Sequence, residues 1–346
     1  MTDTSLFLAA ANGHNTERAP IWIMRQAGRY LPEYRAIKAK HSFWEMARTP
    51  ELACEITLQP LRRFGLDAAI LFQDIMTPLP PMGVKIEFAP GPVFAEPVRS
   101  ARAIDALRVP GKDEIAPFVA EAIKLIREAC PVPLIGFGGA PLTLATYMIE
   151  GGSSKDFEAF RGFLRQEPEA AHRLLDKLTE VSIRYLTMQV EAGAQAIQLF
   201  DSWAGLHDAR SYRAFAKPYN RRIFEALAPY RIPRLYLAVD ALHLYGEIKE
   251  LPCEVVSVDW RAPLSQVRPL LGGKTLQGNL DPAVLLAPKG VIAQEAERVL
   301  REGLGGPHIF NLGHGIMRQT DPDSVAQLVE LVRRYDRVKV REASAS

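Results

Sequence analysis

Eight short apolar runs, each ending in a polar or glycine-rich break, constrain the fold of this chain more than any other feature. The runs are rich in Ile, Val, Leu and Phe, and near-continuous apolarity is typical of parallel strands, which are buried on both faces. They occupy Pro20–Met24, Ala68–Phe72, Val132–Phe137, Ala194–Phe200, Arg234–Val239, Glu254–Val258, Lys274–Gln277 and His308–Leu312. Eight strands that alternate with helices predict an α/β fold of the (β/α)8 TIM barrel type rather than an open sheet.

Segments with helical periodicity separate several of these runs. Helices are predicted in Glu114–Ala129, Ser211–Leu227, Ile292–Glu302 and Asp323–Val338, and two more in Phe157–Gln189, the second starting at Pro168. One stretch departs from the alternation: Val84–Phe88 and Val93–Pro97 flank the sequence Ala-Pro-Gly-Pro. This pattern predicts a β-hairpin excursion after the second strand.

The length of 346 residues would allow two domains at roughly 150 residues each, but an α/β barrel also runs from about 250 to over 400 residues as one domain. No linker, low-complexity tract or internal repeat divides the chain. We therefore expect a single domain over residues 1–346, with the barrel proper at about 18–340.

The charges are nearly balanced, with 42 Lys and Arg against 40 Asp and Glu, a formal net charge of +2. That balance argues against nucleic-acid or membrane binding, which needs a clustered excess of positive charge. Cys54, Cys130 and Cys253 lie far apart, so we expect reduced, mostly buried thiols rather than disulfides or a cysteine-rich zinc site. No secretion signal and no stretch of about 20 apolar residues is evident, which predicts a cytoplasmic protein.

An arginine pair follows the first predicted strand. Arg25 and Arg29 bracket Gly28 in a short loop at the expected mouth of the barrel, where barrel active sites lie. Guanidinium groups bind carboxylate or phosphate with two parallel hydrogen bonds, and a glycine allows a tight turn near a ligand. The loop therefore indicates an anion site, unless both arginines pair with a local acid such as Glu33.

A carboxylate, Asp74, ends the second predicted strand. A charge in that position must be solvated, paired or functional. It could serve chemistry at the mouth, or it could simply form a salt bridge with Arg25 or Arg29. By contrast, Asp281-Pro282 is typical of a loop or a helix start.

Three further polar residues follow other strands. Tyr147 lies in the helix that follows a glycine-rich loop, and it could be a core residue whose hydroxyl needs a partner. Ser202 follows the fourth strand but lacks the Gly-x-Ser-x-Gly motif of acyl-enzyme hydrolases. His314 stands between two glycines after the eighth strand, where it is either exposed to a pocket or structural.

The common cofactor and metal motifs are absent: no His-Glu-x-x-His, paired Cys-x-x-Cys, calcium-loop spacing or dinucleotide fingerprint occurs. What remains is a set of arginines, one prominent carboxylate, a tyrosine, a serine and a histidine at one predicted mouth. This set suits an enzyme without cofactor or metal that acts on a polyanion.

These segments closely resemble the uroporphyrinogen decarboxylase family, in the order that the family has them. The matching segments are Ile23–Arg35, Ile70–Ile75, Gly139–Gly152, Leu199–Gly205, Gly278–Pro282 and Phe310–Gly315. The similarity runs from about residue 5 to about 340, and the first segment matches the family's motif at nearly every residue. The family's fold is a single (β/α)8 barrel, usually in a homodimer, so the resemblance implies the same here.

The resemblance also implies which residues bind the substrate. A departure occurs after the histidine, where Ile316–Pro322 replaces the more typical run Leu-Pro-Glu-Thr-Pro-Pro, so the loop shape there stays open. The side chains expected to contact substrate are Arg25, Arg29, Asp74, Tyr147, Ser202 and His314, with backbone contacts from Gln26, Ala27 and Gly28.

The implied reaction converts the four acetate side chains of uroporphyrinogen III to methyl groups, giving coproporphyrinogen III and CO2 in haem biosynthesis. The implied catalytic residues are Asp74, which would face the pyrrole N–H groups and stabilise a cationic intermediate, with Arg25, Arg29 and Tyr147. His314 is expected to titrate near neutrality. The proton donor stays unassigned, because an arginine is a poor general acid.

Two alternatives remain. A corrinoid-linked methyltransferase shares this barrel but binds zinc through a His-x-Cys pair and a later cysteine. Here the fifth predicted strand ends in Val239-Asp240 without such a pair, and Cys253 stands alone. A non-catalytic porphyrin-binding protein would need a disrupted mouth, whereas Asp74 and both arginines are present.

Overall fold

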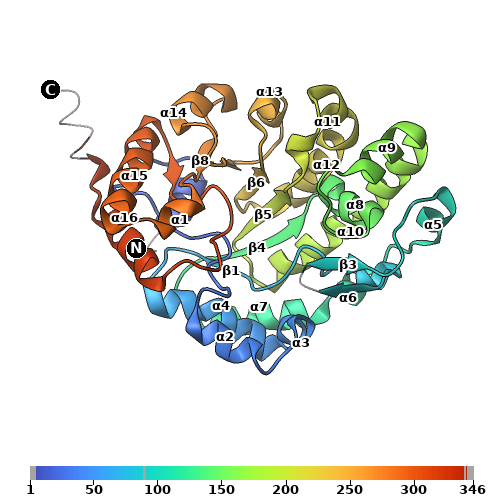
Figure 1. Ribbon diagram of the computed structural model, residues 1–346, viewed down its shortest axis with the longest axis horizontal. Coiled ribbons are helices and arrows are strands. Elements are labelled where there is room, and N and C mark those ends of the chain that lie inside the picture. The colour runs from blue at the N-terminus through green and yellow to red at the C-terminus, as the bar shows by residue number, and fades with distance from the viewer. Residues whose placement is uncertain (1–4, 89–90, 339, 341–346) are drawn as a thin grey trace.

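Seven parallel strands form one curled sheet at the centre of the molecule, and helices surround it (Figure 1). The computed structural model describes residues 5–88, 91–338 and 340. The strands, in their order across the sheet, are β1 (Ala69–Ile70), β4 (Leu134–Gly139), β5 (Ala196–Asp201), β6 (Arg234–Ala238), β7 (Val255–Ser257), β8 (Thr275–Gln277) and β9 (His308–Ile309). Because the strands are parallel, their carboxyl ends lie on one side of the sheet. The loops that follow the strands can build a site there.

The first predicted strand, Pro20–Met24, is not a strand in this structure. Among the described residues, its one β-bridge is the isolated parallel bridge between Ile21 and Phe310. Proline has no N–H to donate, and the N–H of Met24 donates to the side chain of Asn311 at 3.0 Å instead of to a neighbouring backbone. Side chains therefore accept hydrogen bonds that backbone carbonyls would accept in a regular β-ladder.

Helices occupy most of the chain between the strands. Their bounds are α1 (Leu6–Ala11), α2 (Pro32–Lys38), α3 (Phe43–Arg48), α4 (Pro50–Phe64), α5 (Ala101–Ala106), α6 (Lys112–Ile115), α7 (Pro117–Ala129), α8 (Pro141–Glu150), α9 (Glu158–Gln166), α10 (Pro168–Ala192), α11 (Ala209–Phe215), α12 (Lys217–Leu227), α13 (Tyr245–Ile248), α14 (Leu264–Val267), α15 (Lys289–Glu302) and α16 (Pro322–Arg334). The predicted helix start at Pro168 is confirmed.

Two predicted helices are each interrupted once. The segment predicted at 114–129 divides into α6 and α7, because the residue before Pro117 is disfavoured in the α conformation. The segment predicted at 211–227 divides into α11 and α12 at Ala216. Helix α4, whose buried face includes Ile56, was not predicted.

An antiparallel pair of short strands lies outside the main sheet, after β1. In this pair β2 (Ile86–Phe88) runs against β3 (Pro92–Phe94). The indole N–H of Trp44 donates to the carbonyl of Ile86 at 3.1 Å and attaches the pair to α3. Of the predicted turn, Ala89 and Pro90 lie outside the described residues.

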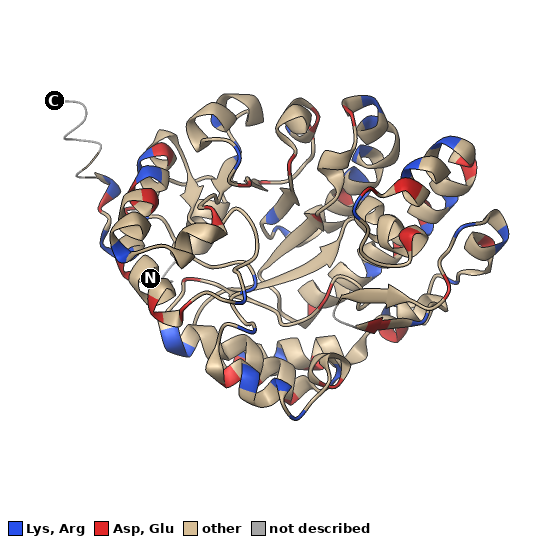
Figure 2. Cartoon of the chain, viewed as in Figure 1, with Lys and Arg blue, Asp and Glu red and all other residues tan. Residues whose placement is uncertain are grey.

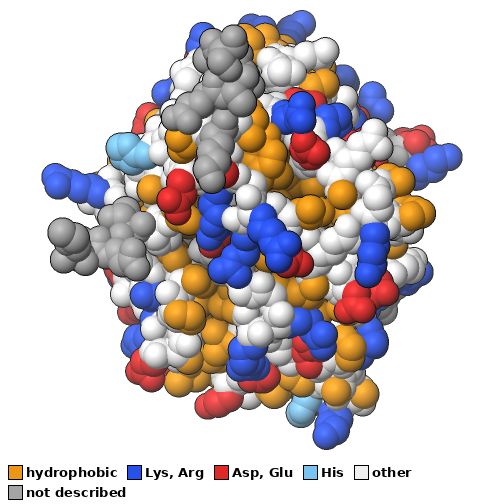
Figure 3. Space-filling view, turned by 90° about the vertical axis from the view of Figure 1, so that its left-hand side faces the viewer, with side chains coloured by type: hydrophobic (Ala, Val, Ile, Leu, Met, Phe, Trp, Pro, Cys, Tyr) orange, Lys and Arg blue, Asp and Glu red, His pale blue; other side chains and the backbone are white. Residues whose placement is uncertain are grey.

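Charged residues are found mainly on the outer helices rather than on the sheet (Figure 2). On the face that carries α15 and α16, basic and acidic side chains are interspersed (Figure 3). Ion pairs four residues apart account for part of this pattern, such as Arg298 with Glu302 at 2.8 Å. Among the described helices, none combines the length and apolarity that a membrane span requires.

Candidate active site

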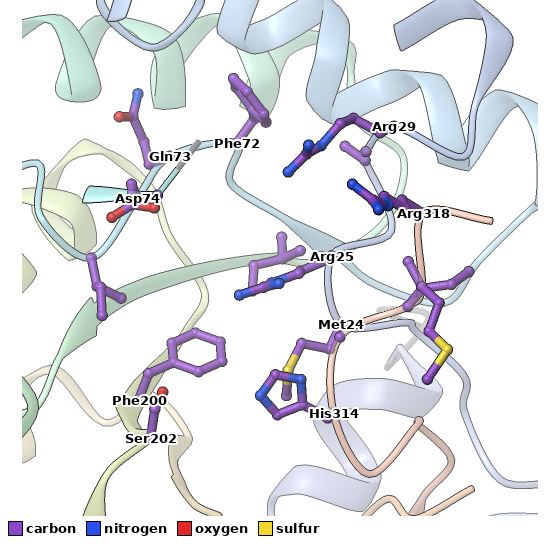
Figure 4. Close-up of a pocket in the computed structure, with 18 of the residues that line it drawn as sticks. Met24, Arg25, Arg29, Phe72, Gln73, Asp74, Phe200, Ser202, His314 and Arg318 are labelled. Carbon is purple, nitrogen blue, oxygen red and sulfur yellow. The ribbon is translucent and has the colours of Figure 1, made fainter. Parts of the chain in front are cut away.

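A cavity of about 890 Å³ opens at the carboxyl ends of the strands. It is lined by residues from the loops that follow the first apolar segment, β1, β5 and β9, together with α8 and the β2–β3 pair (Figure 4). The predicted site residues that line it are Arg25, Ala27, Gly28, Arg29, Asp74, Tyr147, Ser202 and His314. The fold thus brings together residues nearly 290 positions apart in the chain.

The arginine loop has an unusual backbone at its first residue. Arg25 has a φ of 62°, in the left-handed region that non-glycine residues rarely adopt. Its side chain passes against Gly315, where a Cβ atom would lie 2.5 Å from the Arg25 Cδ. A glycine at position 315 therefore leaves the space that the Arg25 side chain occupies on its way into the cavity.

Gln26, predicted to contribute a backbone contact to substrate, is not among the residues that line the cavity. Its side chain is fully buried, accepts the Ile23 N–H at 3.2 Å and donates to the carbonyl of Ala68 at 3.3 Å. Its own backbone carbonyl accepts the hydroxyl of Tyr30 at 2.8 Å, and its N–H donates to Ile23. Gln26 is therefore committed to holding the arginine loop, while Ala27 and Gly28 face the cavity.

The two arginines have no acid partner in the described part of the chain. Glu33, the acid that could have paired with them, is instead held by Arg63 through two bonds of 2.7 and 2.9 Å. No ion pair joins Arg25 or Arg29 to a described carboxylate, Asp74 included. Both guanidinium groups are therefore available to an anion that enters the cavity.

Asp74 follows β1 and ends the apolar run. One of its carboxylate oxygens accepts the N–H of Met76 at 2.9 Å, which fixes the turn. Burial raises its pKa, and the backbone bond and the nearby Arg25 charge partly oppose that shift. Figure 4 shows the Arg25 side chain extending across the cavity between Asp74 and His314. The site therefore holds a partly buried carboxylate with a cation nearby.

Tyr147 and Ser202 border the cavity from α8 and the end of β5. Burial and the charge of Asp74 raise the pKa of Tyr147, so its hydroxyl stays protonated and can donate. Ser202 follows the buried Asp201, whose carboxylate accepts the hydroxyl of Thr143 at 2.8 Å and that of Tyr236 at 2.7 Å. This buried network fixes the end of β5 and with it the backbone that presents Ser202.

His314 does not titrate near neutrality, contrary to the sequence-based expectation. Burial lowers its pKa to about 4, and the positive charges of Arg25 and Arg261 contribute to the shift. Its ring meets the edge of Trp260, with centroids 6.4 Å apart. At neutral pH, His314 is an uncharged hydrogen-bonding group beside the arginines.

Sequence reasoning missed two features of the cavity. The first is an apolar wall that includes Phe137 and Phe200, which meet at right angles with centroids 5.4 Å apart. Alternate residues near the ends of neighbouring strands point to one side, and this spacing could have indicated the wall. The second is Arg318, a third arginine that lines the cavity from the loop after β9.

The cysteines lie away from the cavity. Cys253 lies two residues before β7, at the opposite end of the sheet from the site, and burial raises the pKa of its thiol to about 11. All three cysteines are free thiols, with Cys130 and Cys253 buried and Cys54 partly so. Within the described ranges, no three His, Cys, Asp or Glu side chains gather as a metal-binding group.

Comparison with known proteins identifies the family. The model of the family described as Uroporphyrinogen decarboxylase (URO-D) matches residues 2–335. The chain belongs to the uroporphyrinogen decarboxylase family. A uroporphyrinogen decarboxylase from Citrifermentans bemidjiense is 45% identical over 334 residues, covering 96% of this chain and 98% of that one. One from Geobacter metallireducens is 47% identical over 332 residues, covering 95% and 98% of the two chains.

A solved structure with the same fold comes from a more distant protein. The structure described as a methyltransferase from Methanosarcina mazei matches with a TM-score of 0.79 and 23% sequence identity, covering 95% of this chain and 97% of that chain. At this identity the likeness concerns the fold alone. The sequence-based resemblance to the uroporphyrinogen decarboxylase family is thus confirmed, and the α/β fold is shared beyond it.

Proposed function

We propose that this chain removes CO2 from the four acetate side chains of uroporphyrinogen III, leaving methyl groups and coproporphyrinogen III. The observation that carries the proposal is Asp74, a carboxylate in a cavity that also holds Arg25 and Arg29, none of the three forming an ion pair with another described residue. A tetrapyrrole with eight carboxylates needs cations at its edge and one acceptor for its central N–H groups. The volume of about 890 Å³ lies at the upper end of the roughly 300–1,000 Å³ of small-molecule pockets.

The substrate itself supplies the electron sink in this proposal, so no cofactor or metal is invoked. Protonation of the pyrrole carbon next to the acetate-bearing carbon gives a cation. The C–C bond to the carboxylate then breaks, its electron pair enters the ring, and CO2 leaves. The exocyclic carbon takes up a proton, and the ring loses the one it gained.

Each residue has a role that follows from its environment. Asp74 accepts hydrogen bonds from pyrrole N–H groups and stabilises the cation, which is effective because its surroundings need not reorganise. Arg25 and Arg29 bind substrate carboxylates. Tyr147 donates a hydrogen bond, and neutral His314 and Ser202 orient the bound molecule. The proton donor remains unassigned.

Anaerobic incubation of the purified protein with uroporphyrinogen III, with no cofactor added, tests the proposal. Coproporphyrinogen III should appear, and intermediates should carry seven, six and five carboxylates. Binding without turnover would instead identify a porphyrin-binding protein. Stoichiometric zinc together with methyl transfer would identify a methyltransferase, although Cys253 lies at the wrong end of the sheet for such a site.

The same family resemblance supports proposals on assembly and architecture. We expect one domain over residues 1–346, a homodimer and a cytoplasmic location. We also propose that residues 20–24 take the place of the eighth strand in a closed (β/α)8 barrel. Ile21 bridges to Phe310 on one side, and on the other its carbonyl accepts the N–H of Asp67 at 2.8 Å. Light scattering tests the homodimer.

A further inference from the structure

Arg318 occupies a fixed turn at the cavity although no sequence motif assigned it a role. The turn follows β9, is attached to a neighbouring segment at its start and is closed by a bond of its own. The N–H of Ile316 donates to the carbonyl of Met24 at 3.0 Å, and the N–H of Thr320 donates to the carbonyl of Met317 at 3.1 Å. The first bond joins this turn to the segment that carries Arg25. The backbone that carries Arg318 therefore has a defined position relative to the arginine loop, and the side chain itself is exposed.

Arg318 has no counter-ion within residues 5–88 and 91–338. On a neighbouring loop, Arg261 pairs with Asp259 at 3.2 Å, so the surrounding loops do supply acids. The carboxylates in the described cavity wall are Asp74 and Asp281, and Asp281 already accepts the N–H of Ala283 at 2.9 Å, where it begins a turn of 3-10 helix, as predicted. The charge of Arg318 is thus available to an anion in the cavity.

The three arginines divide into two groups by how they lie relative to Asp74. The charge of Arg25 acts on the pKa of Asp74, whereas the charges that act on it in the described chain include neither Arg29 nor Arg318. Figure 4 shows the guanidinium groups of Arg29 and Arg318 entering the cavity from the same side, opposite Asp74. These two arginines can therefore hold an anion away from the residue that stabilises the reaction centre.

The charge of an arginine stabilises a carboxylate as an anion. Such an ion pair would oppose the loss of that carboxylate as CO2, because it stabilises the ground state and not the transition state. A pair of arginines remote from Asp74 therefore suits a carboxylate that keeps its charge throughout. In the proposed substrate, the propionates meet that description, since only acetates are removed.

We propose that Arg318, together with Arg29, binds a propionate carboxylate that stays on the tetrapyrrole through all four decarboxylations. The inference rests on the proposed function for the identity of the ligand. It assigns Arg318 to substrate and product binding and not to the chemical step. Binding of this kind is equal in the ground state and the transition state, so its loss raises KM and leaves kcat unchanged.

The test uses coproporphyrinogen III as the probe, because it retains the propionates and has lost every acetate. Its Kd is measured by anaerobic equilibrium dialysis for the wild type, Arg318→Gln and Arg318→Lys. Arg318→Gln should raise Kd, and the KM for uroporphyrinogen III, about fivefold, the loss typical of one partly solvated ion pair. Its kcat should stay within about twofold, and Arg318→Lys should recover part of the affinity.

Arg102→Gln is the matched control, because Arg102 is exposed on α5, outside the cavity, and the same charge is removed. It should leave Kd and KM unchanged. An unchanged Kd in Arg318→Gln overturns the proposal, and so does a loss of affinity for uroporphyrinogen III alone, which would assign Arg318 to an acetate. A fall in kcat with unchanged KM overturns it as well.

The failure of this inference differs from a failure of the proposed function. If the wild type converts uroporphyrinogen III and Arg318→Gln binds coproporphyrinogen III normally, only the role of Arg318 is wrong. If the wild type binds coproporphyrinogen III through Arg318 but converts no uroporphyrinogen III, the binding role stands and the proposed reaction is wrong.

Discussion

Asp74→Asn separates the charge of the cavity carboxylate from its structural role. The asparagine oxygen can still accept the N–H of Met76, which Asp74 accepts at 2.9 Å, so the turn should keep its shape. Burial raises the pKa of Asp74, which means that the folded protein disfavours the ionised form. Removing the charge should therefore leave the protein at least as stable as the wild type while it abolishes most of the decarboxylation.

The size of the kinetic effect follows from the environment of the carboxylate. With the wall that includes Phe137 and Phe200 limiting water, an effective dielectric constant of about 20 is reasonable, and opposite charges 4 Å apart then interact by about 4 kcal/mol. Mutagenesis of other preorganised groups gives about 3–4 kcal/mol. Since about 1.4 kcal/mol corresponds to a factor of ten, kcat should fall roughly 100- to 1,000-fold.

The assay is anaerobic turnover of uroporphyrinogen III, with products separated by carboxylate number, alongside unfolding in urea. Asp208→Asn is the control: Asp208 begins α11 as a capping residue outside the cavity, and asparagine caps a helix equally well. It should retain wild-type turnover. If Asp74→Asn keeps kcat within a few-fold of the wild type, the electrostatic role of Asp74 is refuted.

Two further predictions concern the space around Arg25 and the buried histidines. Gly315→Ala should raise KM at least several-fold, because the new Cβ would lie 2.5 Å from the Arg25 side chain. Gly290→Ala, in open space on α15, should leave KM unchanged, and equal KM values for the two variants would contradict the steric argument. Burial lowers the pKa of His207 to about 4 and of His308 to about 3, so the unfolded chain binds more protons as the pH falls below about 6.5. The free energy of unfolding, measured in urea titrations, should therefore fall between pH 7 and pH 5. His207→Gln should make this pH dependence shallower. If the pH dependence is unchanged, His207 is protonated in the folded state as well.

Much of the architecture was predictable because it depends on local patterns. Runs of apolar residues separated by helical segments correctly predicted the strands of the parallel sheet, which are β1 and β4 to β9. Pro168 correctly predicted a helix start. The strand predicted at 20–24 failed because its hydrogen bonds go to side chains, such as that of Asn311, which lies far away in the sequence. No local pattern can reveal that competition.

The site shows the same division. The placement of Arg25, Arg29 and Asp74 was predictable, because loops that follow the apolar runs of an α/β fold lie at the carboxyl side of the sheet. Gln26 differs from its neighbours in the same loop because its side chain donates a hydrogen bond to the backbone of Ala68. The neighbouring residues in the sequence do not indicate which side chain of the loop is buried and which faces the cavity. The pKa of His314 also depends on burial and on charges from other loops.

The sequence by itself determined the α/β class, the family and the order in which the functional loops follow the strands. These properties depend on residue types and on spacing along the chain. Only the tertiary structure decided that Glu33 pairs with Arg63 and not with the cavity arginines, and that Arg318 lines the same cavity. The reason is physical: charge pairing and burial depend on distances through space, and folding brings together loops that are hundreds of residues apart.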